Sequence, residues 1–245
     1  MLMDEKDRAT EIIKGNIAET LMERGCVYEL LRRLFLMGPT EQSLSDLISL
    51  ASVNQENGEV SCPPWKKNFI SFLQTLRPEL GGVLCQKLKP EFTRLFIGPH
   101  HLPAPPYESV YRSAERVLMQ KITIEVREKY RDAGLEVKNL GHEPDDHIGL
   151  ELEFMYYLNR KATDGLKRED LPAMLTAVET QNFFLTEHLS QWVPMFCDDI
   201  AANTCQEFFR CLAGFVKGFI REDSLQVRQL IQTGRELYYK RTHQQ

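Results

Sequence analysis

Apolar side chains recur every three or four residues along most of the chain, which is the spacing of an amphipathic helix. Ile13, Ile17 and Leu21 share one face of a long first helix. Gly38 and Pro39 follow its last apolar positions, and both residue types favour the end of a helix. The pattern therefore predicts a long first helix that ends at this Gly-Pro pair.

Shorter helices are predicted after the first one. Ser43 and Asp46 have the spacing of a capping box, which predicts that a short helix begins there. A polar loop covers residues 54–64, and the next apolar stripe starts near Trp65. Pro90 is expected to interrupt the helix that follows, because proline has no amide hydrogen to donate inside a helix.

The middle of the chain alternates between helical patterns and segments rich in proline or glycine. Residues 98–106 contain four prolines and a glycine, so we expect a stiff, extended loop there. A helical pattern returns over residues 107–131, with a break expected near Thr123. Residues 132–146 are polar and glycine-containing, which predicts a hinge. Asp146 is expected to cap the helix that follows.

The C-terminal third has the same regular spacing. Its first helix carries apolar residues on more than one side, which predicts a central position in the core. Pro194 and the charged residues 221–223 are expected to separate the last helices. No alternating run of β-branched residues and no Asn-Gly or Asp-Gly turn indicates a strand.

The pattern as a whole predicts an all-α fold, a bundle of about ten helices forming one compact unit. The expected organisation is an N-terminal helical part over 1–131, a hinge over 132–147 and a C-terminal helical part over 148–245.

Composition and charge narrow the classes of partner. Hydrophobic residues make up 42% and charged residues 27% of the 245 residues, as in ordinary globular proteins. The net charge of −5 disfavours binding to nucleic acid or to anionic lipid. No apolar stretch reaches the ~20 residues of a membrane span, and the first twenty residues lack the features of a signal peptide. We therefore expect a cytoplasmic protein without stable membrane insertion or a nucleic-acid partner.

Few motifs point to catalysis. The pair Arg32-Arg33 lies inside a helical pattern, so we interpret it as a solvated helix face and not as an export signal. The six cysteines form no C-x-x-C pair, which predicts reduced thiols and no zinc framework. Phosphate-loop, dinucleotide-binding, nucleophile-elbow and H-E-x-x-H motifs are absent from the sequence. No catalytic residue, metal site or cofactor is therefore expected.

One cluster nevertheless has the residue types of a metal site, because imidazole and carboxylate side chains follow one another closely. Its members are His142, Glu143, Asp145, Asp146, His147 and the neighbouring Glu151. The spacing of the two histidines is not that of a standard metal motif. A metal-dependent enzyme that uses the segment from His142 to His147 remains the alternative, and it predicts stoichiometric metal and activity that is lost on chelation.

Two segments resemble the signature motifs of a known family. The first runs from Glu91 through Pro99 to the sequence PPYESVY, which ends at Tyr111. The second is EPDDHIGLELEFM, from Glu143 to Met155. Together they resemble the TorD/DmsD family of redox-enzyme maturation chaperones, whose pattern pairs a PPYES-x-Y run with a later P-x-D-H-x-x-x-E run.

The resemblance implies an all-helical fold with a hinge, and a chaperone without catalytic activity. It also implies binding of the twin-arginine signal peptide, or the apo-form, of a molybdopterin oxidoreductase, which assists cofactor insertion and prevents premature export. The residues that match the motifs become the candidate binding site for the signal peptide or client. They are Pro105, Pro106, Tyr107, Glu108, Ser109, Tyr111, Pro144, Asp146, His147 and Glu151.

Physical chemistry points to the same site. A twin-arginine leader presents two guanidinium groups followed by an apolar segment, so its receptor needs carboxylates beside an apolar surface. The acidic residues of 143–153 supply the first, and Tyr107, Tyr111 and Met155 are expected to supply the second. We expect Asp146 to keep one oxygen for an arginine and His147 to make binding depend on pH.

Two further expectations stay open. A family member can bind the surface of a mature enzyme or a nucleotide instead of a leader, although the chain has no phosphate loop. The chain is expected to be a monomer or a homodimer that is domain-swapped through residues 132–146.

Overall fold

A computed structural model describes residues 5–56, 63–76, 82–99, 101–113, 116–119, 121–136 and 143–242. Regular secondary structure in these residues is helical, so the all-α prediction is confirmed. The helices are α1 (Glu5–Met37), α2 (Glu41–Glu56), α3 (Pro64–Thr75), α4 (Gly82–Phe96), α5 (Glu108–Arg112), α6 (Lys121–Asp132), α7 (Ile148–Lys167), α8 (Leu171–Phe184), α9 (Ser190–Asn203) and α10 (Glu207–Thr242). A π-helical turn, η2 (Leu185–Leu189), joins α8 to α9.

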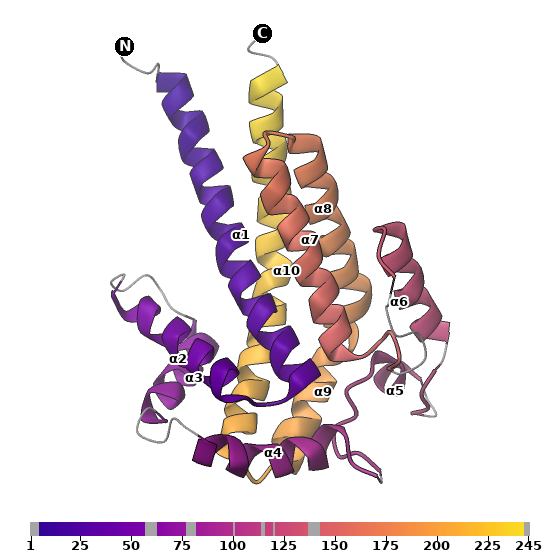
Figure 1. Ribbon diagram of the computed structural model, residues 1–245. Coiled ribbons are helices and arrows are strands. Elements are labelled where there is room, and N and C mark those ends of the chain that lie inside the picture. The colour runs from indigo at the N-terminus through magenta and orange to yellow at the C-terminus, as the bar shows by residue number, and fades with distance from the viewer. Residues whose placement is uncertain are drawn as a thin grey trace.

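Four long helices, α1, α7, α8 and α10, run side by side and form the body of the molecule (Figure 1). α1 packs against α7 and α10, and α7 packs against α8. α3 lies against α10, with α2 packed on α3, while α4 crosses the lower end of the bundle (Figure 1). α5 packs against α9 and α6, on the side where α7 begins. The start of α7 is thus brought next to the proline-rich segment.

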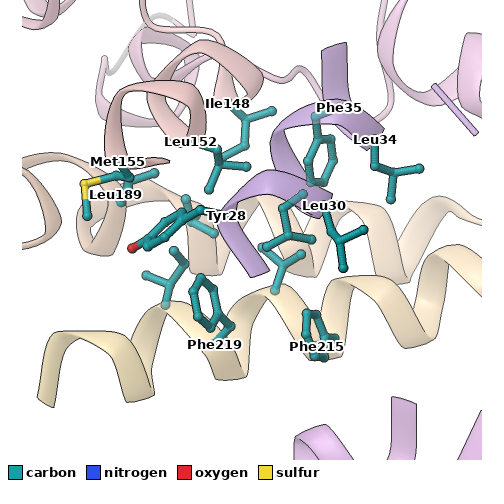
Figure 2. Packing of buried hydrophobic residues seen from close by; sticks show 14 of the residues in the cluster. Tyr28, Leu30, Leu34, Phe35, Ile148, Leu152, Met155, Leu189, Phe215 and Phe219 are labelled. Atoms are coloured by element: carbon teal, nitrogen blue, oxygen red, sulfur yellow. The ribbon is translucent and has the colours of Figure 1, made fainter. Parts of the chain in front are cut away.

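Side chains from distant parts of the sequence share one core. Figure 2 shows Tyr28 and Phe35 of α1 facing Leu152 and Met155 of α7, with Phe219 of α10 completing the cluster. The rings of Tyr28 and Phe219 meet edge to face, with their centroids 5.1 Å apart. Leu152 and Met155 are fully buried, so the central position predicted for this helix is confirmed. Burial of such side chains supplies about 1.5–3 kcal/mol each relative to exposure.

A polar network lies inside this apolar core. Arg24 of α1 and Asp223 of α10 are 1% and 0% exposed, and the guanidinium donates through Nε and Nη2 to the two carboxylate oxygens. Arg24 Nη1 also donates to Gln181 Oε1 of α8 at 2.9 Å, and the Tyr28 hydroxyl donates to Asp223. Asn159 of α7 donates to the carbonyl of Leu21 at 2.8 Å. Polar bonds thus join the four long helices at their centre.

The expectation of a turn at residues 221–223 is wrong. α10 continues through this charged run, and Asp223 points inward to Arg24. A charged residue can be buried in mid-helix when an opposite charge and further hydrogen-bond donors satisfy it. Since that partner lies almost two hundred residues away, the local sequence does not reveal it.

Two prolines also fail to end their helices. α4 continues through Pro90 and α9 continues through Pro194. Each proline removes one helical hydrogen bond at a cost of ~3 kcal/mol. Both helices bury apolar side chains on either side of the proline, such as Leu88 and Phe92 in α4, and this burial offsets the loss. The break expected near Thr123 occurs earlier, between α5 and α6.

The cap of α2 lies one turn before the expected position. Thr40 Oγ1 accepts from the amide of Ser43 at 3.0 Å, and Ser43 Oγ accepts from the amide of Thr40 at 2.9 Å. These reciprocal bonds have the geometry of a capping box, so α2 begins at Glu41 and not at Ser43. Residues with side-chain oxygens stand at both positions, and only the structure shows which one precedes the helix.

Other expectations concern the surface and the hinge. Arg32 pairs with Glu29, and Arg33 with Asp46 at 3.0 Å, so the arginine pair belongs to a helix face. The hinge over 132–147 stays a prediction, because residues 137–142 lie outside the described part of the chain. Among the helices that the structure describes, none is both long enough and apolar enough to span a membrane.

The buried ion pair predicts a large effect of one substitution. In Asp223→Ala the Arg24 guanidinium would stay buried without its counter-charge, which costs roughly 3–5 kcal/mol. We expect the free energy of unfolding, measured by urea denaturation, to fall by about that amount with an unchanged m-value. The control is Glu179→Ala, which removes an exposed carboxylate 2.7 Å from Arg235 and should cost less than about 1 kcal/mol. Equal losses in the two variants would contradict the proposed role of the buried pair.

Candidate functional site

The two motif segments, far apart in the sequence, are joined by backbone hydrogen bonds. The amide of Glu108 donates to the carbonyl of Asp146 at 3.0 Å. The amide of Ile148 donates to the carbonyl of Pro106 at 2.8 Å. Between these bonds residues 107 and 147 form an isolated antiparallel β-bridge. We call this paired region, residues 106–109 with residues 145–149, the motif joint.

Asp146 ties α5 and α6 to the motif joint. Its carboxylate accepts from the backbone amide of Ser109 at 2.8 Å and from Thr123 Oγ1 of α6 at 2.9 Å. Ser109 lies in the first turn of α5, whose N-cap residue Tyr107 gives no side-chain cap. Asp146 therefore caps α5 from a distant segment, and the expectation that it caps α7 is wrong. Both of its oxygens are engaged and the residue is fully buried, so neither oxygen stays open for an arginine.

His147 is the residue that caps α7. Its Nδ1 accepts from the backbone amide of Gly149 at 3.0 Å, so a neutral ring carries its proton on Nε2. Burial lowers the pKa of His147, which favours this neutral form. Glycine is needed at position 149 in the first turn of α7, because a Cβ there would lie 2.6 Å from Cγ of Leu36 in α1.

Tyr107 and Glu143 form the outer edge of the motif joint. The Tyr107 hydroxyl donates to Glu143 Oε1 at 2.6 Å, and its ring meets the His147 ring edge-on at 5.4 Å. Glu143 is exposed and Tyr107 is half-buried. Asp145, by contrast, is buried and accepts from Arg127 Nε at 2.7 Å. Of the acidic residues expected to form a cluster, Glu143 is accessible at this edge, and Glu153 is half exposed on α7, where it lies 3.5 Å from Arg32.

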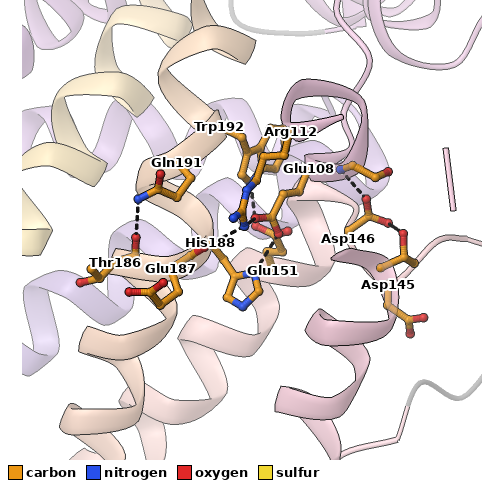
Figure 3. A network of polar contacts seen from close by, with 12 residues as sticks. Glu108, Arg112, Asp145, Asp146, Glu151, Thr186, Glu187, His188, Gln191 and Trp192 are labelled. Atoms are coloured by element: carbon orange, nitrogen blue, oxygen red, sulfur yellow. Dashed lines mark hydrogen bonds and ion pairs between the residues drawn. The ribbon is translucent and has the colours of Figure 1, made fainter. Parts of the chain in front are cut away.

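A second buried network lies behind the motif joint (Figure 3). The Glu108 carboxylate accepts from Arg112 Nη1 at 2.7 Å, and its other oxygen lies 2.9 Å from His188 Nδ1. Glu151 Oε2 accepts from the indole of Trp192 at 3.0 Å, while Oε1 has no hydrogen-bond partner within the described residues. Burial, and next the nearby Glu108 carboxylate, raise the pKa of Glu151 well above its usual range. Burial in the fold therefore favours the protonated form of Glu151.

The remaining motif residues differ in accessibility. Pro106 is buried, whereas Pro105 and Pro144 are half-buried. Tyr111 is also half-buried, and its ring stacks on Trp192 with centroids 5.6 Å apart. Met155 is fully buried in the core, so the expectation that it contacts a peptide is wrong.

The structure adds residues that the motifs did not indicate. Thr123, Arg112, His188 and Trp192 all contact candidate residues, and they come from α5, α6, η2 and α9. Their distance along the chain explains why no local pattern revealed them. Beyond Tyr111, the surface between α5 and α9 is hollowed into a pocket of about 360 Å³, lined by Val110, Tyr111, Arg116, Met195, Asp198 and Asp199.

The described residues give little support to a metal-dependent enzyme that uses the segment from His142 to His147. Among the described residues, no group of three or more His, Cys, Asp or Glu side chains is placed to hold a metal ion. His142, one member of the expected cluster, lies outside the described residues. Asp145 and Asp146 are engaged by Arg127, Ser109 and Thr123.

The protonated state of Glu151 predicts how stability depends on pH. The folded chain keeps this proton at pH values where the unfolded chain has lost it, so the free energy of unfolding falls as pH rises above about 5. The slope from this group approaches ~1.4 kcal/mol per pH unit. In Glu151→Gln an amide takes the place of the neutral acid, accepting from Trp192 and donating towards Glu108. We expect this variant to gain stability relative to wild type between pH 5 and pH 8.

The measurement is urea denaturation of both proteins across this pH range. Glu153→Gln on the same helix is the control, because that side chain is half exposed and its removal should leave the difference from wild type nearly constant. A difference between Glu151→Gln and wild type that does not change with pH would show that Glu151 is ionised in the fold.

Comparison with known proteins identifies the family. A family model described as nitrate reductase delta subunit matches residues 58–198, which include both motif segments. The chain is 27% identical over 199 residues to a Haemophilus influenzae protein named "Probable Tat proofreading chaperone DmsD", a match that covers 79% of this chain and 86% of the relative. It is 26% identical over 219 residues to the chaperone protein TorD of Vibrio cholerae, with 86% and 94% covered.

A solved structure has the same fold. A redox enzyme maturation protein from Archaeoglobus fulgidus superposes with a TM-score of 0.52 at 23% identity, over 80% of this chain and 93% of that one. The curated relatives are named as chaperones and not as enzymes. The chain therefore belongs to the nitrate reductase delta subunit family, and the resemblance to the TorD/DmsD chaperones that its two motifs predicted is confirmed.

Proposed function

We propose that this protein is a cytoplasmic, system-specific chaperone for an exported molybdopterin oxidoreductase. It binds the twin-arginine leader of the client and its apo-form, assists cofactor insertion and prevents premature export. The observation that carries the proposal is the motif joint, where backbone hydrogen bonds join both signature segments. Similarity to chaperones named TorD and DmsD over most of the chain supports it.

The candidate residues divide into two groups by burial. Five fully buried or nearly buried residues hold the surface in shape and do not touch the leader: Glu108, Ser109, Asp146, His147 and Glu151, with Pro106 beside them. The residues that contact the leader are half-buried: Pro105, Tyr107, Tyr111 and Pro144. Glu143 joins the second group because its carboxylate is exposed next to Tyr107.

This arrangement suits an arginine-rich leader. The Glu143 carboxylate can exchange its single bond from the Tyr107 hydroxyl for two parallel bonds from a guanidinium, which also brings the opposite charge. The tyrosine rings and prolines beside it give apolar contact to the segment that follows the arginines. Because the joint is fixed by backbone bonds, little conformational freedom of the receptor is lost on binding.

Fluorescence anisotropy with labelled leader peptides from the host's molybdoenzymes tests the proposal. We expect one leader to bind selectively and its Lys-Lys version to bind more weakly, because lysine cannot form the planar two-bond contact of a guanidinium. Glu143→Gln should weaken binding of the arginine leader by about tenfold, since one charge-assisted bond is lost.

The control for charge is Glu179→Gln, which removes an exposed carboxylate on α8 and should leave binding unchanged. Circular dichroism of every variant checks that the fold is retained. No binding of any leader to folded wild-type protein would reject leader recognition and direct attention to the surface of the mature enzyme.

The oligomeric state is part of the proposal. We expect a monomer, or a dimer that exchanges helices through residues 132–146. Light scattering over a range of concentrations separates the two states, and a single monomer mass at every concentration would exclude the exchange.

A further inference from the structure

The pocket between α5 and α9 already holds a guanidinium. Arg116 Nη2 lies 2.8 Å from Asp199 Oδ2, and its Cζ lies 5.3 Å from the centroid of the Tyr111 ring. A carboxylate and an aromatic face are the two groups with which proteins most often bind a guanidinium. Tyr111 is fixed in place by stacking on the buried Trp192. We call this position, between Tyr111 and Asp199, the guanidinium seat.

The guanidinium seat belongs to a pocket with mixed chemistry. Val110 and Met195 give it aliphatic walls, and Met195 is 42% exposed. A second carboxylate, Asp198, pairs with Lys217 of α10 at 2.6 Å. Both ion pairs lie at the surface, where water competes for them and exchange of one cation for another is easy. The pocket thus combines replaceable cations with apolar surface.

Arg116 and the residues after it resemble a leader in sequence. Val117, Leu118 and Met119 are 46%, 44% and 68% exposed, so an arginine is followed by three accessible apolar side chains. Arg116 and Met119 have positive φ angles of 52° and 57°, a left-handed conformation that is unfavourable for such side chains. The segment therefore holds its arginine in the seat at a conformational cost. When the arginine leaves the seat, the backbone of residues 116–119 can relax.

We propose that residues 116–119 are an internal mimic of the client's leader, with Arg116 occupying the guanidinium seat that a leader arginine takes over. This inference rests on the proposed function and adds a second contact region, next to the motif joint on α5. The apolar part of the leader then packs against Val110 and Met195 of the pocket wall. The partner class is a peptide in which arginine precedes an apolar segment.

Competition by Arg116 has a consequence for selectivity. A leader binds only the fraction of molecules in which the seat is empty, so its apparent dissociation constant equals the intrinsic constant divided by that fraction. A peptide that offers only a positive charge gains too little to displace Arg116, whereas a leader also gains the apolar contacts. The seat thus excludes weakly bound cationic peptides.

Removal of the mimic is the first test. In Arg116→Ala the seat is empty, and we expect the client leader to bind on the order of tenfold more tightly than to wild type in the anisotropy assay. Lys121→Ala is the matched control, because it removes one positive charge close by in the sequence from a side chain that pairs with Glu125 and not with the pocket. The control should change affinity little, and that change should vanish at high salt.

A double-mutant cycle with Asp199→Asn gives the second test. On the Arg116→Ala background this change should weaken leader binding by about tenfold, because the seat loses its carboxylate. On the wild-type background it should have a much smaller effect, because it also frees Arg116 from the seat. Both positions are at least partly exposed, so thermal midpoints should stay close to that of wild type.

The outcomes separate this inference from the proposed function. Leader binding that is equal in wild type and Arg116→Ala, and additive effects of Asp199→Asn, would reject the mimic and leave the chaperone function intact. Binding by Arg116→Ala but not by wild type would support a mimic that closes the seat strongly. Absence of binding in both proteins, with the fold retained, would overturn the mimic together with leader recognition.

Discussion

The organisation of the site depends on the backbone pairing between the loop before α5 and the loop before α7. α5 has only five residues, too few to be stable as an isolated helix, and its own N-cap residue offers no side-chain bond. The Asp146 carboxylate supplies that cap from the other motif. Proline at 106 has no amide to donate, yet its carbonyl accepts from Ile148. The first residues of α5 and of α7 are therefore each held by a backbone bond to the other motif.

Buried acids are satisfied in three different ways, and each fixes a different contact between helices. Asp146 accepts backbone and hydroxyl hydrogen bonds, which joins α5 and α6 to the start of α7. Asp223 faces the guanidinium of Arg24, which joins α10 to α1. Glu151 keeps its proton, because burial and the neighbouring Glu108 disfavour a second negative charge. A buried charge without such compensation would be costly, so these groups also limit which packing arrangements are allowed.

The same chemistry has a different consequence at the surface. The Arg24–Asp223 pair is inaccessible and permanent, whereas Arg116 and Asp199 form an ion pair with side chains that are 56% and 32% exposed. Water and salt weaken the exposed pair, so a competing guanidinium can replace Arg116 there. The motif joint and the stacked Tyr111 give the surface rigidity, and the exposed pairs give it exchangeable contacts. A chaperone that must bind a client and later release it needs both properties.

The sequence alone determined the all-α fold class, the long first helix, the central helix after residue 147 and the two motif segments, because these depend on local spacing and residue type. It did not determine which buried acid pairs with which group. Asp146 was expected to cap α7 and instead caps α5, and the charged run that ends at Asp223 was expected to form a turn and instead lies within α10. Pro90 and Pro194 show the same limit, since burial on both sides of each proline outweighs a local helix-breaking preference. Contacts between residues distant in the chain decided all of these outcomes, and only the tertiary structure brings such residues together.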